Sequence, residues 1–346
     1  MKALLLYKIQ KVDQSATPLY LKDISKPEPG SGEIRLRVLV CGVCHTELDE
    51  IEGRTPPGQF PVVLGHQVVG VVDKTGEGAH RYKKGARLGV AWIFSACGTC
   101  EYCRRGEENL CADFKATGRD ANGGYAEYMV IPERFAYAIP ENLEDGAAAP
   151  LLCAGAIGYR SLRLTGLSNG QTLGLTGFGA SAHLVLKAVR HKYPDTDVFV
   201  FARNPNERKF ALELGAKWAG DTDEQAPELL DAIIDTTPAW KPVMEALKNL
   251  KPAGRLVINA IRKEDADKDL LLKLQYEDHL WMEKEIKTVA NVARRDVEEF
   301  LQLAGEIPLQ PDYTEYPMEN ANEALQELKA GKIRGAKVLR IAYSEH

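Results

Sequence analysis

Four closely spaced cysteines form the clearest chemical pattern in this chain. Cys97, Cys100, Cys103 and Cys111 follow the spacing C-x2-C-x2-C-x7-C. Four thiolates in one loop can surround a tetrahedral zinc ion and leave no position for a substrate, which is typical of a structural site. The alternatives are free or redox-active thiols and an iron–sulfur cluster, although the spacing matches neither common ferredoxin pattern. We therefore predict a structural zinc ion in this loop.

The remaining cysteines fall in two places. Cys41 and Cys44 flank a short Gly-Val pair, Cys153 lies far downstream, and His66 follows a glycine ahead of an apolar run. A catalytic zinc takes three protein ligands and keeps one position open, and two cysteines with one histidine are an accepted set. Taken singly, each residue is more simply a core side chain. Together with the cofactor pattern described next, they favour a catalytic metal.

A glycine-rich turn lies in the second half of the chain. Residues 177–182 have the form G-x-G-x-x-A, directly after an apolar stretch at 172–176 and before a helical pattern at 181–191. This strand–turn–helix context is typical of dinucleotide binding, because the glycines let the backbone approach a pyrophosphate at the helix N-terminus. The residues expected at the phosphates are Gly177, Phe178, Gly179, Ala180 and Ser181.

The next expected strand, 198–202, ends without an acidic residue. An NAD site usually has Asp or Glu at this position to bind the ribose 2′-hydroxyl. Here Ala202 occupies it and Arg203 follows. Loss of the carboxylate removes repulsion of a 2′-phosphate, and a guanidinium can pair with that phosphate. We predict that NADP(H) is preferred over NAD(H), the alternative being an ordinary surface arginine.

The expected elements divide the chain into two kinds of structure. Apolar strands at 1–7, 33–40, 68–72, 86–92 and 123–130 alternate with Gly- and Pro-rich turns, which is typical of an irregular, mostly β domain. From residue 170, strands at 172–176, 198–202, 232–235 and 255–260 alternate with helices, including 207–214. That alternation predicts a parallel sheet with helices on both faces. The end of the chain, from about residue 296, indicates helix, strand, helix and strand.

Composition narrows the function classes. The chain has 346 residues, enough for two domains, and its formal net charge of −5 argues against a dominant nucleic-acid or membrane surface. No apolar run is long enough to cross a bilayer, and the start is unlike a signal peptide. Seven cysteines, mostly clustered, fit reduced thiols in a cytoplasm better than disulfides.

These motifs occur in the order seen in zinc-dependent medium-chain alcohol dehydrogenases, which the chain resembles over essentially its whole length. Residues 150–155, Pro-Leu-Leu-Cys-Ala-Gly, and 177–183 bring it nearest to the cinnamyl-alcohol-dehydrogenase-like branch. The resemblance implies an α/β protein with two domains. A mostly β, GroES-like catalytic domain would comprise residues 1–153 and 291–346, and a doubly wound Rossmann domain would comprise residues 154–290.

The resemblance also implies residue roles. It selects Cys44, not Cys41, as the ligand that joins His66 and Cys153 at the catalytic zinc. Thr46 matches the hydroxyl that takes the alcohol proton, His45 is a neighbour on the cofactor side, and Asp49 stands where the family often has a proton-relaying histidine. Gln67 replaces a usual glutamate, so any step that needs that carboxylate becomes doubtful.

The expected activity is interconversion of a primary alcohol and its aldehyde by hydride transfer to or from NAD(P), with two zinc ions per chain. The expected partners are a small-molecule substrate and further copies in a homodimer or homotetramer. Alternatives on the same fold are an enzyme for a polyol or other alcohol, a zinc-independent reductase, and an inactive NADPH-binding protein.

Overall fold

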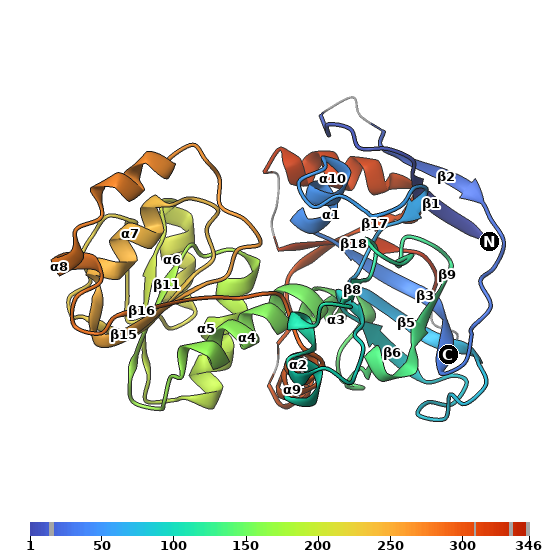
Figure 1. Cartoon of the computed structure of the whole chain (residues 1–346), viewed down its shortest axis with the longest axis horizontal. Coiled ribbons are helices and arrows are strands. Elements are labelled where there is room, and N and C mark those ends of the chain that lie inside the picture. Colours follow the sequence, from blue (N-terminus) through green and yellow to red (C-terminus); the bar gives the residue numbers. More distant parts are fainter. Residues whose placement is uncertain (14–16, 308, 332–334, 344–346) are drawn as a thin grey trace. The chain divides into compact units, whose positions relative to one another are not determined.

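The computed structural model describes residues 1–13, 17–307, 309–331 and 335–343 (Figure 1). The chain forms two compact units. Unit 1 comprises Met1–Cys153 and Val292–His346, and unit 2 comprises Ala154–Asn291. No helix among the described residues has the length and apolar character needed to cross a membrane.

The main sheet of unit 1 has the strand order β10-β6-β5-β3-β18-β17, and β9 also pairs with β3. These strands are β3 Glu33–Val43, β5 Val68–Thr75, β6 Arg87–Val90, β9 Tyr128–Pro132, β10 Ala136–Ala138, β17 Tyr313–Pro317 and β18 Ala336–Arg340. Smaller sheets join β2 Leu19–Asp23, β1 Lys2–Leu6 and β4 Val62–Val63, and pair β7 Ile93–Ser95 with β8 Lys115–Ala116.

Strand β3 organises unit 1. Its run of alternating apolar residues is buried almost throughout, and it is antiparallel to β5 along one side. Along the other side, Glu33–Arg37 pair with β9 and Val40–Val43 pair with β18. Because both sides of β3 are covered, its end is held firmly, and the candidate ligand Cys44 comes directly after it.

Helices of unit 1 are short apart from two near the end of the chain. They are α1 His45–Ile51, α2 Glu101–Arg104, α3 Asp145–Pro150, α9 Arg294–Glu306 and α10 Ala321–Lys329, with single turns η1 Glu108–Leu110, η2 Glu133–Phe135 and η5 Met318–Asn320. The predicted helix–strand–helix–strand order after residue 296 is therefore present.

Unit 2 is a parallel sheet in the order β13-β12-β11-β14-β15-β16. Its strands are β11 Thr172–Thr176, β12 Asp197–Phe201, β13 Trp218–Gly220, β14 Leu230–Asp235, β15 Leu250–Ile258 and β16 Glu285–Thr288. Its helices are α4 Ala156–Thr165, α5 Ala180–Lys192, α6 Pro205–Glu213, α7 Lys241–Lys248 and α8 Tyr276–His279, with the turn η4 Lys268–Lys273. The strand order turns back at β11, which confirms the predicted doubly wound fold.

Successive side chains of these strands enter two different cores. Leu173, Leu175 and Val200 pack with residues of α4 and α5 on one face, whereas Phe199 and Ile233 pack with α7 on the other. This alternation is the strand period of two. Burial on both faces explains why the strands are apolar runs that the sequence made easy to predict.

One predicted strand begins later than expected. Residues 123–127 are not part of a strand, and β9 starts at Tyr128. The reason is close backbone contact, because a Cβ on Gly123 would lie 2.0 Å from the carbonyl oxygen of Gly65. Instead, Gly123, Gly124 and Tyr125 donate backbone hydrogen bonds to residues 63–65. These hydrogen bonds hold residues 63–65, which directly precede His66, in place.

Candidate metal centres and cofactor site

Cys44 is the N-cap of α1. Its extended backbone, with φ −138°, ends β3 and lets its Sγ accept from the Thr46 amide at 3.4 Å. Glu47 completes a capping box, since its Oε2 accepts from the Cys44 amide at 2.8 Å. The helix start thus fixes the thiol through its own backbone.

His66 is positioned by the glycine before it. Gly65 has φ +96°, and a Cβ there would lie 2.5 Å from the Tyr125 ring, so only glycine fits. The His66 side chain is 1% exposed, with Nε2 3.8 Å from the Cys44 Sγ and Nδ1 2.6 Å from the Glu47 Oε1. A carboxylate on one ring nitrogen leaves the other free to face a metal, an arrangement common around zinc.

Cys153 lies in a π-helical segment, Leu151–Gly155, between α3 and α4. Such wide turns interrupt a helix and are frequent at functional sites. The ligand atoms of Cys44, His66 and Cys153 all lie within 4.8 Å of one another. Residues that are far apart in the sequence therefore meet in one cluster with one soft nitrogen and two sulfur donors.

The cluster has the electrostatics of a cation site. The Cys153 thiol and burial raise the pKa of Cys44 well above its usual value, so the bare pocket disfavours a thiolate. Glu50 is 0% exposed, and neither carboxylate oxygen has a hydrogen-bond partner among the described residues. Burial and nearby Glu47 raise the pKa of Glu50 to about 8. Because buried negative charge is costly without a partner, a divalent cation fits these residues.

Gln67 is uncharged and therefore adds no negative charge beside the proposed cation. It is 4% exposed, and a Cβ on Gly42 would lie 2.5 Å from its Oε1. The main-chain carbonyl oxygen of Gln67 accepts a hydrogen bond from the Gly42 amide at 2.9 Å. The neutral amide is therefore packed closely against β3.

The residues expected to serve proton transfer surround the start of α1. His45 is exposed and Thr46 is half-buried, both in the first turn. Asp49, which is 6% exposed, forms an ion pair with Arg54. The ion pair therefore holds the Asp49 carboxylate, on the first helix of unit 1, against Arg54.

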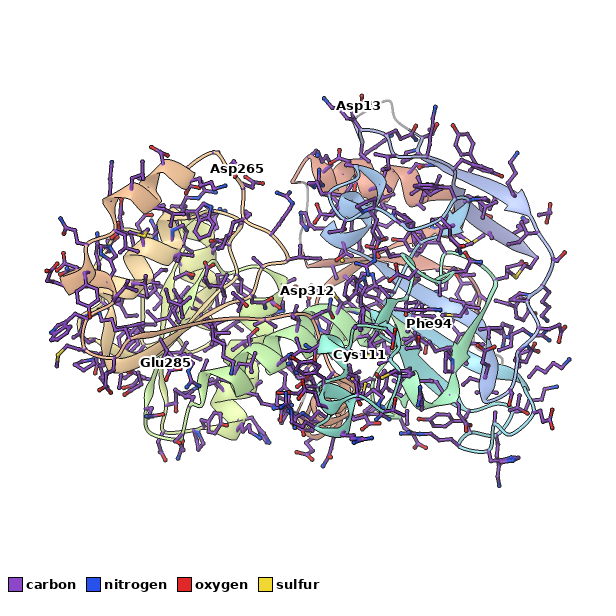
Figure 2. All side chains as sticks on the ribbon, viewed as in Figure 1. Asp13, Phe94, Cys111, Asp265, Glu285 and Asp312 are labelled. Atoms are coloured by element: carbon purple, nitrogen blue, oxygen red, sulfur yellow. The ribbon has the colours of Figure 1, made fainter. Side chains whose placement is uncertain are left out.

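The four-cysteine loop also converges. The sulfur atoms of Cys97, Cys100, Cys103 and Cys111 lie within 4.8 Å of one another, and Figure 2 labels Cys111 beside the short helix α2. The amides of Thr99 and Cys100 donate to Cys97 Sγ at 3.4 and 3.3 Å.

These contacts lower the pKa of Cys97 to about 6, the Thr99 amide having the largest effect. Burial raises the pKa of Cys103 to about 12. One thiolate is therefore ready at neutral pH, while another needs a metal to replace its proton. The set fits a closed structural zinc site.

The glycine-rich turn lies at the end of β11, where the strand order reverses. Gly177 has φ +75° and donates to the Phe201 carbonyl at 2.8 Å. Gly179 is the N-cap of α5, and a Cβ there would have no neighbour within 4 Å. Open space over a helix N-terminus suits an anion. Phe178 is buried, Ala180 begins α5, and Ser181 Oγ donates to the Ala154 carbonyl at 2.6 Å.

Two arginines lie at the end of β12. Arg203 is exposed at this end, as a phosphate contact would need. Arg208, which sequence reasoning overlooked, turns back to the same place and donates to the Ala202 carbonyl at 2.7 Å and to Asp221 at 3.2 Å. Arg208 thus holds the strand end, and Arg203 is the arginine presented to solvent.

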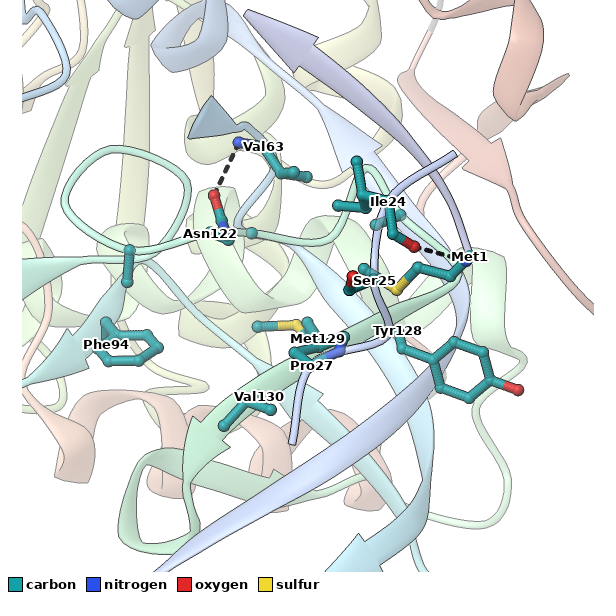
Figure 3. A pocket seen from close by; sticks show the side chains of 13 residues that line it. Met1, Ile24, Ser25, Pro27, Val63, Phe94, Asn122, Tyr128, Met129 and Val130 are labelled. Carbon is teal, nitrogen blue, oxygen red and sulfur yellow. Dashed lines mark hydrogen bonds between the residues drawn. The ribbon is translucent and has the colours of Figure 1, made fainter. Parts of the chain in front are cut away.

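A separate cavity of about 200 Å³ lies in unit 1 (Figure 3). Beside it the Val63 amide donates to Asn122 Oδ1 at 3.0 Å, and the Met1 amine donates to the Ile24 carbonyl at 2.8 Å. Its lining is mostly apolar and includes none of the candidate metal ligands. The cavity therefore offers packing space rather than a group of reactive side chains.

Comparison with known proteins agrees with this geometry. The alcohol dehydrogenase GroES-like domain matches residues 30–141. A probable alcohol dehydrogenase, AdhA, from Mycobacterium tuberculosis is 40% identical over 320 residues, covering 91% of this chain and 90% of that protein. Cinnamyl alcohol dehydrogenase 8 from Arabidopsis thaliana is 30% identical over 332 residues, covering 92% and 90%. A cinnamyl alcohol dehydrogenase structure from Sorghum bicolor covers 100% of this chain and 99% of its own, with TM-score 0.82 and 28% identity. The chain belongs to the zinc-dependent medium-chain alcohol dehydrogenases, in their cinnamyl-alcohol-dehydrogenase-like branch.

Proposed function

We propose that this NAD(P)-dependent alcohol dehydrogenase acts on primary alcohols and their aldehydes at a zinc ion held by Cys44, His66 and Cys153. The observation that carries the proposal is the meeting of these three ligand atoms within 4.8 Å. A zinc ion held there would supply a Lewis acid for the alcohol oxygen, and a bound nicotinamide cofactor would supply the hydride acceptor. Zinc analysis tests the assignment, because two ions per chain should fall to one in a Cys153→Ala variant.

Protein residues handle the proton and the geometry. Glu47 orients the His66 ring through its contact with Nδ1 and so keeps Nε2 directed at the metal position. The Thr46 hydroxyl, two residues after a ligand, takes the proton that the alcohol loses. Thr46→Val should remove most turnover while Thr46→Ser keeps it, with zinc content equal in both. Near-normal turnover in the valine variant would refute the relay.

The preference for primary alcohols rests on Trp92. Its ring packs against Phe114 with centroids 5.3 Å apart and ring planes 39° apart, and the Arg119 guanidinium lies 5.0 Å from its centroid. Trp92 is 7% exposed, and its side chain lies beside the Glu50 carboxyl group. We infer that this ring lines the substrate side of the metal centre, where a rigid aromatic side chain would disfavour branched substrates. Trp92→Ala should raise kcat/KM for secondary alcohols relative to primary ones.

NADP(H) is the proposed preferred cofactor because Arg203 follows β12 and no carboxylate occupies the strand end. Arg203→Gln should lower kcat/KM for NADP while leaving that for NAD nearly unchanged. Arg208→Gln is the matched control, since its side chain already binds the Ala202 carbonyl. A wild-type enzyme that prefers NAD would refute the assignment.

Further copies of this chain are the proposed protein partners. Strand β16 forms one edge of the unit 2 sheet, and all four of its residues are exposed, including Glu285, which Figure 2 labels. Trp281, Met282 and Ile286 are 52%, 50% and 46% exposed. An uncovered strand edge beside apolar side chains favours pairing with another edge. Native mass spectrometry of an Ile286→Lys variant should show smaller assemblies than the wild-type homodimer or homotetramer.

A reducing compartment such as the cytoplasm is the proposed location. All seven cysteines are free thiols, and six of them are the candidate metal ligands. Free thiols in such clusters persist where glutathione and thioredoxin keep them reduced. Fractionation of the native cells should therefore recover the enzyme with cytoplasmic markers.

A further inference from the structure

Two similar polar clusters lie at opposite ends of the same strands in unit 2. At the amino end, Asp231 binds Lys251 at 2.8 Å and accepts from Thr172 Oγ1 at 2.8 Å. At the carboxyl end, Asp235 pairs with Lys263 and accepts from Thr176 Oγ1 at 2.6 Å. The threonines are the first and last residues of β11, and the aspartates lie on β14.

The carboxyl-end cluster is far more buried than its counterpart. The side chains of Lys263 and Asp235 are 9% and 0% exposed, whereas those of Lys251 and Asp231 are 39% and 22% exposed. A buried ion pair is costly to desolvate and adds little stability compared with apolar packing. Stability alone therefore does not explain why charged rather than apolar side chains occupy this position, so we next consider what the pair positions.

Lys263 joins two loops over the carboxyl end of the sheet. Besides Asp235, its ammonium donates to the carbonyl oxygens of Thr237 at 2.7 Å and Ala239 at 3.0 Å. An ammonium has three N–H donors, so all of them are used inside the protein. Lys263 is consequently a positioning residue that has no donor left for a ligand.

The loop that Lys263 holds touches the glycine-rich turn. A Cβ on Gly177 would lie 3.0 Å from both Thr236 Oγ1 and Thr237 Cγ2. Thr237 Oγ1 in turn donates to Asp235 at 2.8 Å, and Thr236 binds the Thr176 carbonyl. The pair therefore sets the position of the residues that line one side of the phosphate-binding turn.

The topology of the sheet indicates which half of the cofactor lies beside the loop after β14. Ligands of doubly wound sheets bind outside the carboxyl ends of the strands, at the point where the order reverses. That point is β11, with β12 and the exposed Arg203 to one side and β14 to the other. If the adenosine half extends toward β12, the nicotinamide half extends toward β14 and β15.

We propose that the Lys263–Asp235 pair is a clamp that positions the nicotinamide half of the dinucleotide. The inference rests on the cofactor site proposed above. It assigns to the pair a role in cofactor binding that the Lys251–Asp231 pair, at the other end of the same strands, does not share.

The test compares Lys263→Met with Lys251→Met in the full-length, zinc-loaded protein. Equilibrium binding of NADPH, with NADH in parallel, is measured by fluorescence, and binding of adenosine 2′,5′-bisphosphate by calorimetry. Lys263→Met should weaken NADPH binding by about tenfold or more, which corresponds to about 1.4 kcal/mol of binding free energy. The bisphosphate, which lacks nicotinamide, should bind within about threefold of wild type to both variants, and Lys251→Met should change neither affinity.

A second variant covers the case in which an unpaired Asp235 disrupts folding. Asp235→Asn with Lys263→Met removes both charges and keeps an oxygen for Thr176 and Thr237, and it should show the same selective loss of NADPH affinity. The clamp is overturned if NADPH binds this variant like wild type, if the bisphosphate weakens equally, or if Lys251→Met has the same effect. Failure of the wild-type protein to bind either dinucleotide would instead overturn the proposed cofactor site itself.

Discussion

Glu47→Gln separates the two tasks that one carboxylate performs at the metal centre. Oε2 of Glu47 caps α1 by accepting from the Cys44 amide at 2.8 Å, and Oε1 contacts His66 Nδ1 at 2.6 Å. Glutamine is also a capping-box residue, so the helix start should survive. The charged contact to the imidazole is lost, because an amide bears no charge.

The expected size of the effect follows from those two contacts. Loss of an outer-shell partner of a ligating histidine typically lowers metal affinity by about 10–100-fold, or about 1.4–2.7 kcal/mol. Removing a cap altogether would cost about 0.5–2 kcal/mol of protein stability, but glutamine retains it. Glu47→Gln should therefore lose zinc affinity with little change in the melting temperature of the metal-free protein.

Chelator competition measures that affinity, and the chain supplies a matched control. Asp296 occupies the same position at the start of α9, where it accepts from the Ala293 amide at 2.8 Å and is 0% exposed. Asp296→Asn also keeps an accepting oxygen for the helix start, so it should change neither the melting temperature much nor the zinc affinity. The reasoning fails if Glu47→Gln binds zinc as tightly as wild type, or if Asp296→Asn releases zinc equally fast.

Three further predictions follow from individual contacts. Burial opposes ionisation of Glu52, but its hydrogen bonds to Lys329, the Val12 amide and Arg54 lower its pKa from 4.5 to about 2. The ionised carboxylate should therefore contribute up to about 3 kcal/mol of stability above pH 4.5, and this contribution should disappear as the pH falls toward 2. Urea unfolding at pH 7 and pH 3 should show Glu52→Gln losing this difference, and a constant gap between variant and wild type would contradict it. Burial raises the pKa of Glu50 to about 8, so the metal-free protein should lose stability as the pH rises from 5 to 8. Thermal melts of Glu50→Gln should show a smaller fall in melting temperature over this pH range. An equal fall in variant and wild type would refute the assignment. Cys111→Ser should lower zinc content by one ion per chain and the melting temperature with it, while initial turnover per folded molecule is kept; an unchanged zinc content would remove the four-cysteine site.

The sequence predicted the parallel sheet well because its strands are buried on both faces. β11, from Thr172 to Thr176, occupies the predicted residues, and β12 differs by one residue at each end. In the β-rich half the apolar pattern was less decisive. Residues 123–127 are as buried as a strand, yet their glycines bind loop backbone at residues 63–65.

The candidate site was partly readable and partly not. Spacing pointed to the four-cysteine loop, and the resemblance to the family selected Cys44, His66 and Cys153. Glu47 was missed, although Cys44-x-x-Glu47 has the spacing of a capping box with cysteine in place of serine. Glu50 follows Glu47 by three residues, so the two carboxylates share one face of α1, a signal that helical spacing could have revealed. The Lys263–Asp235 pair had no local signal, because it joins two loops whose contact exists only in the folded sheet.

The pairing of β3 with β18 has a consequence for synthesis of the enzyme. Val40–Val43 lead directly into Cys44 and pair with Lys337–Arg340, which emerge from the ribosome long after them. Unit 2 is continuous in sequence and can fold as soon as residue 291 is out, since domains generally fold as units during translation. Until β18 arrives, the end of β3 that leads to Cys44 is paired only with β5, so we expect the Cys44 thiol to be more open to oxidants and to competing metals. Metal loading is therefore expected to be among the last steps in maturation, and the cell's supply of reduced thiols during translation bears directly on the yield of active enzyme.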